Sequence, residues 1–186
     1  MPSSTSESIP YEIEFIRKNR PQLSSVLDVG IGFGKGAFLI REYFDVKENK
    51  LYQPKDWKVK ITGVEVYQAY LSELQRMLYN EILIGDIFKI LPKLGKYDLA
   101  IFGDIIEHFS KEQGLSLLHN MFEHVEDIVV ITPNGFMTHP ATGNNTQEEH
   151  KSGWTLADFK DFTIIDKAIV HRIRKDAEVL IVYVRK

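Results

Sequence analysis

Glycines and one acidic residue follow a short apolar run at a spacing suited to binding a nucleotide-like ligand. The residues from Ser25 to Gly36 read SVLDVGIGFGKG, with glycine at every second position from Gly30 onwards. Asp28 lies two residues before the first glycine. Glycine lacks the Cβ that would block close approach of a ligand, and the amides at the start of a following helix point toward that ligand. The stretch therefore predicts a strand, a ligand-binding turn and a helix.

Three ligand patterns compete for this turn. A phosphate-binding P-loop ends in Gly-Lys-Ser/Thr, whereas Lys35 is followed here by Gly36, so we reject that pattern. The dinucleotide pattern GxGxxG fails when it is counted from Gly30, but it fits loosely from Gly32 with Ala37 in place of the last glycine. The third pattern, acid-x-Gly-x-Gly-x-Gly, is filled without a gap by Asp28, Gly30, Gly32 and Gly34.

Acidic side chains also lie at the carboxyl end of the second predicted strand, Lys60–Val66, and directly after the third, Glu81–Gly85. In an open parallel sheet, ligands bind outside the carboxyl ends of the strands. Glu65 is placed to accept hydrogen bonds from both hydroxyls of a ribose. Asp86 suits the amino group of an adenine with Ile87 beside the ring, and it equally suits the N-cap of a short helix.

Three polar side chains crowd the end of the fourth predicted strand, Tyr97–Gly103; they are Asp104, Glu107 and His108. The pKa of an imidazole is ordinarily near neutrality, so His108 is our candidate general base. The alternative is that His108 hydrogen-bonds a loop carbonyl and holds that loop in place. His150 is a second candidate base, and Glu107 would orient either histidine.

Alternating strand and helix patterns predict an α/β fold, a doubly wound three-layer αβα sandwich. We expect a seven-stranded, mostly parallel sheet that ends in a C-terminal antiparallel hairpin. The expected helices cover 9–19, 37–44 and 67–78, and a further one starts at Ser110; the later strands cover 127–132, 162–170 and 178–184.

Two segments without periodicity interrupt this pattern. We predict an inserted loop at 44–60 and a substrate lid at 136–153, because a long structureless loop in a compact domain is usually functional or disordered. Residues 1–8 are expected to be disordered or loosely attached, and 9–186 to form a single domain.

In this order, the motifs resemble those of class I S-adenosylmethionine-dependent methyltransferases over about residues 9–186. The matching segments are DVGIGFG at 28–34, GVEV at 63–66, GDI at 85–87, GDIIEHF at 103–109, TPNG at 132–135 and HKSGWT at 150–155. The resemblance implies in-line transfer of the methyl group of S-adenosyl-L-methionine (SAM) to an acceptor, with S-adenosyl-L-homocysteine (SAH) as product. The cofactor-binding residues that it implies are Asp28, Gly30, Gly32, Gly34, Glu65, Val66, Asp86, Ile87, Asp104 and Ile105.

Departures from the family's patterns narrow the expected acceptor. The Asp/Asn-Pro-Pro-aromatic motif of many base and amide N-methyltransferases is missing after the fourth strand, and the net charge of −3 argues against nucleic acid. We therefore expect a small-molecule acceptor. No metal site is predicted, although Asp104, Asn134 and the histidines can be assembled into one on paper. The alternatives are an NAD(P)-dependent oxidoreductase and a non-catalytic SAM-binding module.

Composition agrees with an ordinary globular protein of 186 residues, 44% of them hydrophobic and 26% charged. The absence of cysteine excludes disulfides and a cysteine nucleophile and fits a cytoplasmic location. No apolar run approaches the roughly 20 residues of a membrane helix, and the first residues lack the basic and apolar regions of a secretory signal. Homo-oligomers are compatible with the sequence, which does not determine the oligomeric state.

Overall fold

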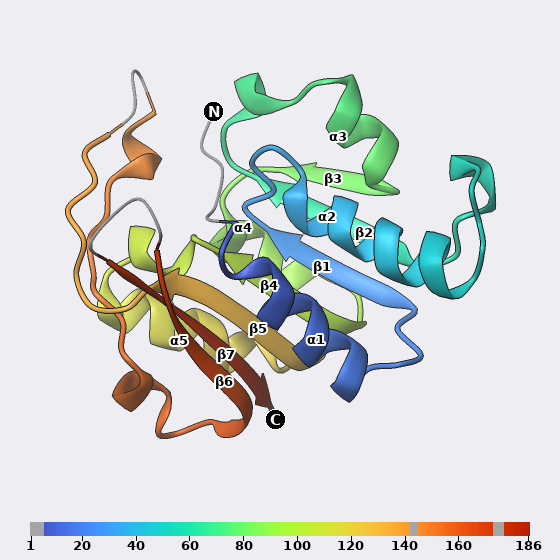
Figure 1. The fold of residues 1–186 in the computed structure, drawn as a ribbon. Coiled ribbons are helices and arrows are strands. Elements are labelled where there is room, and N and C mark those ends of the chain that lie inside the picture. The colour runs from blue at the N-terminus through green and yellow to red at the C-terminus, as the bar shows by residue number, and fades with distance from the viewer. Residues whose placement is uncertain (1–5, 142–144, 173–176) are drawn as a thin grey trace.

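The computed structural model describes residues 6–141, 145–172 and 177–186. Helices and strands alternate along the chain as the sequence pattern predicts (Figure 1). The helices are α1 Ile9–Asn19, α2 Lys35–Ile40, α3 Glu73–Leu78, α4 Ile87–Ile90 and α5 Lys111–Met121. The strands are β1 Ser25–Val29, β2 Lys60–Glu65, β3 Glu81–Ile84, β4 Tyr97–Gly103, β5 Val125–Pro133, β6 Thr163–His171 and β7 Glu178–Arg185. Among the described residues, no helix has the length and apolar character needed to cross a membrane.

All seven strands form one sheet in the order β3-β2-β1-β4-β5-β7-β6. The first five strands pair in parallel, and β7 pairs antiparallel with both β5 and β6. The order reverses between β1 and β4, so the turns after these strands flank the switch point at which doubly wound sheets bind ligands. The predicted mostly parallel sheet with a C-terminal antiparallel hairpin is confirmed.

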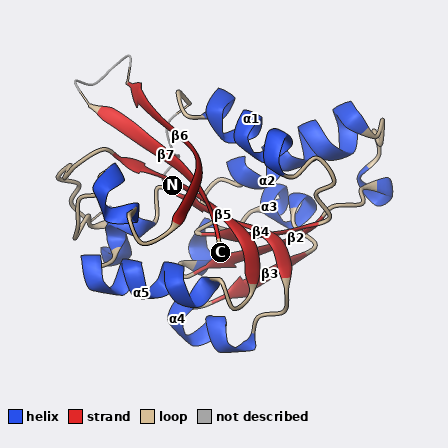
Figure 2. Cartoon of the chain, turned by 90° about the horizontal axis from the view of Figure 1, so that it is seen from below, coloured by secondary structure: helices blue, strands red, loops and turns tan. Residues whose placement is uncertain are grey.

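Helices cover both faces of the sheet, so that the core has two layers (Figure 2). The central strands are apolar on both faces, as the near-continuous hydrophobic runs predict. Ala100 and Phe102 of β4 pack toward α4 and α5, whereas Leu99 and Ile101 pack toward α1, α2 and α3. This alternation follows from the two-residue period of a strand and gives the three-layer αβα sandwich.

The segment predicted as an inserted loop at 44–60 begins as helix. The chain continues from α2 as a π-helical stretch, Arg41–Glu48, so the expected helix end at Phe44 is wrong. Its charged residues are internally paired: Arg41 is buried, donates to Asp45 Oδ2 over 2.8 Å, and donates to the carbonyl oxygen of Leu78. Buried charges break the apolar period on which the sequence prediction relied.

The helix predicted over 67–78 is also interrupted. Residues Gln68–Tyr70 form one 3-10 turn, and α3 starts anew after Ser72, which forms a capping box with Gln75. The spacing Ser-x-x-Gln is a helix-start signal in its own right, and it overrides the apolar stripe that suggested a continuous helix.

The prediction for the N-terminus can be compared with the structure only from residue 6, because residues 1–5 lie outside the described residues. Ser8 is fully buried and its carbonyl accepts hydrogen bonds from the amides of Tyr11 and Glu12. Ser8 is thus part of the folded body, and the expected loose attachment of residues up to 8 is wrong at this position.

Candidate functional site

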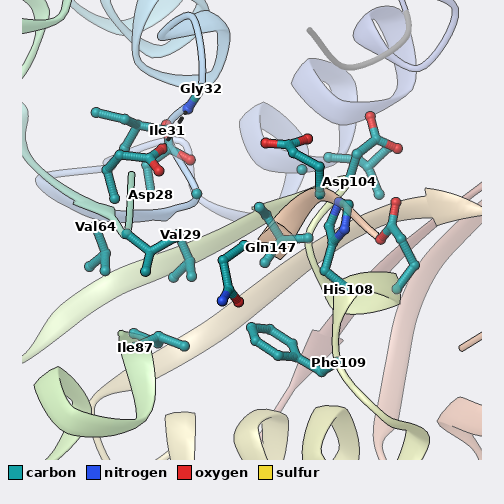
Figure 3. A pocket seen from close by; sticks show the side chains of 18 of the residues that line it. Asp28, Val29, Ile31, Gly32, Val64, Ile87, Asp104, His108, Phe109 and Gln147 are labelled. Atoms are coloured by element: carbon teal, nitrogen blue, oxygen red, sulfur yellow. Dashed lines mark hydrogen bonds between the residues drawn. The ribbon is translucent and has the colours of Figure 1, made fainter. Parts of the chain in front are cut away.

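A cavity of about 500 Å³ opens at the carboxyl ends of the parallel strands. Its walls come from the turns after β1, β2, β3 and β4, from α1, and from the segment between β5 and β6 (Figure 3). The predicted cofactor-binding residues that line it are Asp28, Gly30, Gly32, Glu65, Val66, Asp86, Ile87, Asp104 and Ile105. Sequence reasoning therefore brought together residues that the fold places around one cavity.

The glycine turn after β1 requires glycine at two positions for different reasons. Gly30 has a φ of 75°, and a Cβ built on it would lie 1.9 Å from Cδ1 of Ile105 across the cavity wall. Gly34 has a φ of 89° and precedes α2, where a Cβ would meet Leu78 of α3 at 3.2 Å. Gly34 does not line the cavity, so its role here is to form the turn and pack it against α3.

Asp28 lies at the end of β1, buried between the glycine turn and α3. Tyr79 Oη donates to Asp28 Oδ2 over 2.6 Å, and a Cβ on Gly36 would lie only 2.7 Å from the same oxygen. Burial raises the pKa of Asp28 to about 6, although hydrogen bonds from Tyr79 and from the amide of Ala37 oppose this shift. The carboxyl group both orders the turn and faces the cavity.

Glu65 and Asp86 hold the next two turns. Glu65 Oε1 accepts from the amide of Tyr67 over 2.8 Å, and Glu65 Oε2 accepts from the amide of Gly32 over 3.3 Å. A carboxylate has about four lone-pair sites, so Glu65 can still accept from a ligand hydroxyl. Asp86 Oδ1 accepts from the amide of Phe88 over 3.0 Å, which confirms the predicted N-cap. Asp86 also lines the cavity.

Charged residues that no sequence motif indicated also line the cavity wall, among them Glu12 and Lys35. Glu12 comes from α1 and is 2% exposed, and burial raises its pKa to about 7 against the opposing charge of Lys35. Lys35 follows the glycine turn, and burial lowers its pKa. The signal for Glu12 was its place four residues before Ile16, on the face of the helix that the apolar residues mark as buried.

The segment between β5 and β6 closes one side of the cavity. Its described residues that line the wall include Met137, His139, Asn145, Gln147, Glu148, His150 and Lys151. Asn145 Nδ2 donates to Tyr70 Oη over 3.2 Å, which joins this segment to the turn after β2. At its far end Trp154 is fully buried against Gly114, where a Cβ would lie 2.5 Å from the indole. The segment is therefore fastened on two sides of the cavity.

His150 of this segment meets His108, which follows β4, beside the buried carboxyl group of Glu107. Their rings lie 4.9 Å apart, and His150 Nε2 lies 4.0 Å from Glu107 Oε1. Burial and the negative charge of Asp104 raise the pKa of Glu107 well above its usual range. Burial also lowers the pKa of His108, and lowers that of His150 to about 4. Both imidazoles are therefore neutral at pH 7.

Asp104 starts this turn in a left-handed backbone conformation, with a φ of 53°. This conformation is unfavourable for residues other than glycine, although aspartate tolerates it better than most. The amide of Asp104 still donates to Ile131 of β5 over 2.8 Å, so the strand pairing ends at this residue and the chain bends into the cavity wall. Figure 3 shows Asp104 and His108 across the cavity from Asp28 and Gly32.

Comparison with known proteins relates this arrangement to solved structures alone, since no family model and no curated protein sequence matches the chain. The N-terminal domain of EvdMO1, crystallised in the presence of SAH and D-fucose, aligns over 98% of this chain and 84% of its own, with a TM-score of 0.64 and 14% identity. Magnesium protoporphyrin IX methyltransferase ChlM from Synechocystis PCC 6803, with bound SAH, aligns over 96% and 82%, with a TM-score of 0.63 and 15% identity. TehB from Haemophilus influenzae aligns over 95% and 62%, with a TM-score of 0.62 and 14% identity.

The strand order, the cavity at the switch point and these neighbours together give the chain the class I SAM-dependent methyltransferase fold.

Proposed function

We propose that this protein is a SAM-dependent methyltransferase that acts on a small-molecule acceptor. One observation carries the proposal: the turns after β1, β2 and β3 bring the glycines, Glu65 and Asp86 to a single cavity in the order in which methionine, ribose and adenine follow one another in SAM. Two of the neighbouring structures, the EvdMO1 domain and ChlM, contain SAH. The cofactor of this chain is accordingly SAM, and SAH is its product.

The charge of the cavity wall favours SAM over a dinucleotide. Among the described residues, seven acidic side chains line the wall (Glu12, Asp28, Glu65, Asp86, Asp104, Glu107 and Glu148) against three basic ones (Lys35, Lys151 and Arg172). SAM carries an ammonium and a sulfonium, whereas NAD carries two phosphates that such a wall would repel. This balance disfavours the oxidoreductase alternative.

The acceptor enters beside the segment between β5 and β6, which we propose as the substrate lid. Met137 and His139 lie on the cavity wall next to His150, at the methionine end of the proposed cofactor site. The acidic wall and the net charge of −3 oppose a polyanion, so we propose a small molecule rather than nucleic acid as acceptor. We also propose a cytoplasmic location, as the lack of cysteine suggests.

His108 is the residue that we propose to act on the acceptor. Its Nδ1 lies 3.2 Å from the carbonyl oxygen of Glu149, and a donor at Nδ1 leaves a lone pair at Nε2. This contact also matches the alternative expectation, in which His108 holds the lid. The two roles agree, because the hydrogen bond that holds the lid also fixes the tautomer with a basic Nε2. Methyl transfer forms the acceptor–carbon bond, breaks the sulfonium carbon–sulfur bond and passes the acceptor proton to this nitrogen.

Calorimetric titration with SAM and SAH, with NAD and NADP as controls, tests the proposal. We expect micromolar binding of SAM and SAH and a loss of roughly 10- to 100-fold in Glu65→Ala, the range for a hydrogen bond to a charged group. Tyr52→Ala is a matched control, because Tyr52 is 69% exposed and does not line the cavity. Preferential binding of NAD would overturn the proposal, and SAM binding without turnover on any acceptor would favour the non-catalytic module.

A further inference from the structure

Glu107, His108 and His150 form a group of three metal-ligating side chains at one end of the cavity. Each offers one ligand atom, and these three atoms lie within 4.8 Å of one another. Glu107 and His108 follow β4 in the short turn Ile106–His108, whereas His150 comes from the segment after β5. The fold thus joins residues that are more than 40 positions apart in the sequence (150 against 107 and 108).

Both imidazoles are oriented by backbone carbonyls. His150 Nδ1 lies 2.7 Å from the carbonyl oxygen of Met137, and His108 Nδ1 lies 3.2 Å from that of Glu149. A carbonyl only accepts, so each Nδ1 carries the proton and each Nε2 keeps its lone pair. Histidine ligands of metals are held in this way, with one ring nitrogen donating to an outer acceptor and the other facing the ion.

Glu107 supplies a third oriented donor. Thr132 Oγ1 donates to Glu107 Oε2 over 3.1 Å, which fixes the carboxyl group, while Oε1 is buried without a hydrogen-bond partner in the described part of the chain. The residue is only 2% exposed. An orphaned buried carboxyl oxygen costs stability and calls for an explanation.

Direct pairing of Glu107 with His150 does not satisfy this oxygen. The separation between Oε1 and His150 Nε2 is 4.0 Å, beyond the 3.2 Å limit of an ordinary N–H···O hydrogen bond. Around a tetrahedral ion, metal–nitrogen and metal–oxygen distances of about 2.0–2.2 Å place ligand atoms roughly 3.3–3.6 Å apart. The present separations are wider than this, so a small rotation of these side chains would bring all three atoms onto one cation.

We propose that Glu107, His108 and His150 bind one divalent transition-metal ion, such as Zn²⁺ or Mn²⁺, through Oε1 and the two Nε2 atoms. Two imidazoles and one carboxylate suit first-row transition ions better than Mg²⁺ or Ca²⁺, which prefer all-oxygen sites. Three protein ligands leave a coordination position open toward the cavity. The role that follows rests on the proposed methyltransferase function: the open position takes an oxygen of the acceptor and lowers its pKa.

This assignment reverses the sequence-based expectation of no metal site, and it changes the part played by His108. With the ion bound, the Nε2 lone pair of His108 is a ligand and no longer takes the acceptor proton. The ion in place of the imidazole would activate the acceptor, whose oxygen would lose its proton to water on coordination. The acceptor class becomes more specific as well: it carries an oxygen that binds a transition metal, as a phenol, an enol or a hydroxy acid does.

Metal binding by the protein alone tests the site without any acceptor. We would strip the protein with a chelator and titrate it with Zn²⁺ and Mn²⁺ by calorimetry, with Co²⁺ by visible absorption, and with Mg²⁺ for comparison. We expect one transition ion per chain and no stoichiometric Mg²⁺ binding. Affinity should fall more than about 100-fold in His150→Gln and Glu107→Gln, beyond the 10- to 100-fold cost of losing an outer partner.

Two further variants sharpen the result. His119→Gln is the matched control, because His119 stacks on Phe162 away from the cavity, and it should bind Zn²⁺ as the unmodified protein does. Thr132→Val removes the partner of Glu107 Oε2 and should weaken Zn²⁺ about 10-fold. Titration of each variant with SAH shows that it is folded and separates the two proposals.

The outcomes are distinct. Stoichiometric Zn²⁺ or Mn²⁺ binding that His150→Gln loses and His119→Gln retains supports the site. No transition-metal binding, or binding that all variants share equally, overturns it. Failure of SAH to bind the unmodified protein would overturn the methyltransferase proposal, and the metal result would then stand without its role in methyl transfer.

Discussion

Carboxyl groups lie at both ends of the parallel strands, and their surroundings differ between the two ends. At the carboxyl end, burial raises the pKa of Glu12, Asp28, Glu65 and Glu107. At the amino end, the pKa values of Asp98 and Asp127 are lowered. Every group of the first set lines the cavity, and neither aspartate of the second set does.

The difference lies in the partners rather than in the degree of burial. Asp127 is fully buried, yet Arg20, Tyr183 and Arg185 all donate to its two oxygens. Burial pushes the pKa of Asp127 upward, but hydrogen bonds from Arg185, Arg20 and Tyr183 outweigh it. Glu107 has only the hydroxyl of Thr132 as a side-chain partner in the described residues.

Such a contrast separates a stabilising end from a binding end. A buried acid with few partners lowers the free energy of unfolding, but it can still form a favourable interaction with a cationic ligand. Acids that the fold pairs completely contribute to stability. The comparison yields predictions in which folding and ligand binding respond to different residues.

The largest effect is expected at the paired end. Asp127→Ala leaves two arginine side chains and the hydroxyl of Tyr183 without their shared acceptor, and loss of one partner of a buried ion pair costs about 3–5 kcal/mol. Urea unfolding should show this loss as a lower midpoint with little change in slope. SAH affinity measured on the folded variant should stay within about twofold of the unmodified protein, because Asp127 lies at the far end of the sheet; a large drop would contradict the separation of the two ends.

Glu65→Gln should give the opposite result. The glutamine side chain keeps one oxygen acceptor but offers an NH₂ group where the amide of Gly32 or a ribose hydroxyl requires an acceptor. We expect SAH affinity to fall by roughly 1.5–3 kcal/mol, the worth of hydrogen bonds to a charged group. The free energy of unfolding should change by less than that, since burial raises the pKa of Glu65 and its charge is costly in the fold. A fold that weakens more than SAH binding does would break the comparison.

The sequence predicted the binding end better than the stabilising end. Asp28, Glu65, Asp86 and His108 were found because each lies at or just after the carboxyl end of a predicted strand, and in a parallel sheet these strand ends meet at one edge. Asp127 was predicted only as the first residue of a strand. Its partners Arg20, Tyr183 and Arg185 come from distant parts of the chain, and no local pattern brings them together.

Errors in the predicted elements have a similar cause. The helical stretch Arg41–Glu48 continues past the predicted helix end at Phe44, where charged residues break the apolar period, because the fold buries Asp45 and pairs it with Arg41. The proximity of Glu107 to His150 likewise depends on the path of the segment after β5. Periodicity reports which face is apolar, and it does not report which charges are satisfied by distant backbone groups.

Glu12→Gln should change how stability depends on pH. The pKa of Glu12 is raised to about 7 in the folded state, from about 4.3 in an unfolded chain. The folded state therefore holds the proton more tightly, so stability falls as pH rises from about 4 to 7, by at most about 1.4 kcal/mol per pH unit for one group. The variant lacks this decline, so its free energy of unfolding should rise relative to that of the unmodified protein as the pH increases from about 4 to 7. Urea unfolding at pH 4, 5, 6 and 7 measures the difference, and a constant difference would contradict the raised pKa of the buried Glu12.

Asp98→Ala should have the smallest effect and tests whether partners or charge make the amino end stable. Asp98 is half-buried and accepts from the amides of Ser24 and Ser25 and from the hydroxyl of Ser24, with no cation among its hydrogen-bond donors in the described residues. Neutral donors at a part-exposed site are each worth about 1 kcal/mol net, and water replaces the lost acceptor there. We expect urea unfolding to show a loss of about 1–2 kcal/mol, less than half that of Asp127→Ala.

Because the pKa of Asp98 is lowered, its contribution to stability should disappear as pH falls below about 4. Equal losses in the two variants would mean that the arginines around Asp127 add nothing beyond ordinary hydrogen bonds.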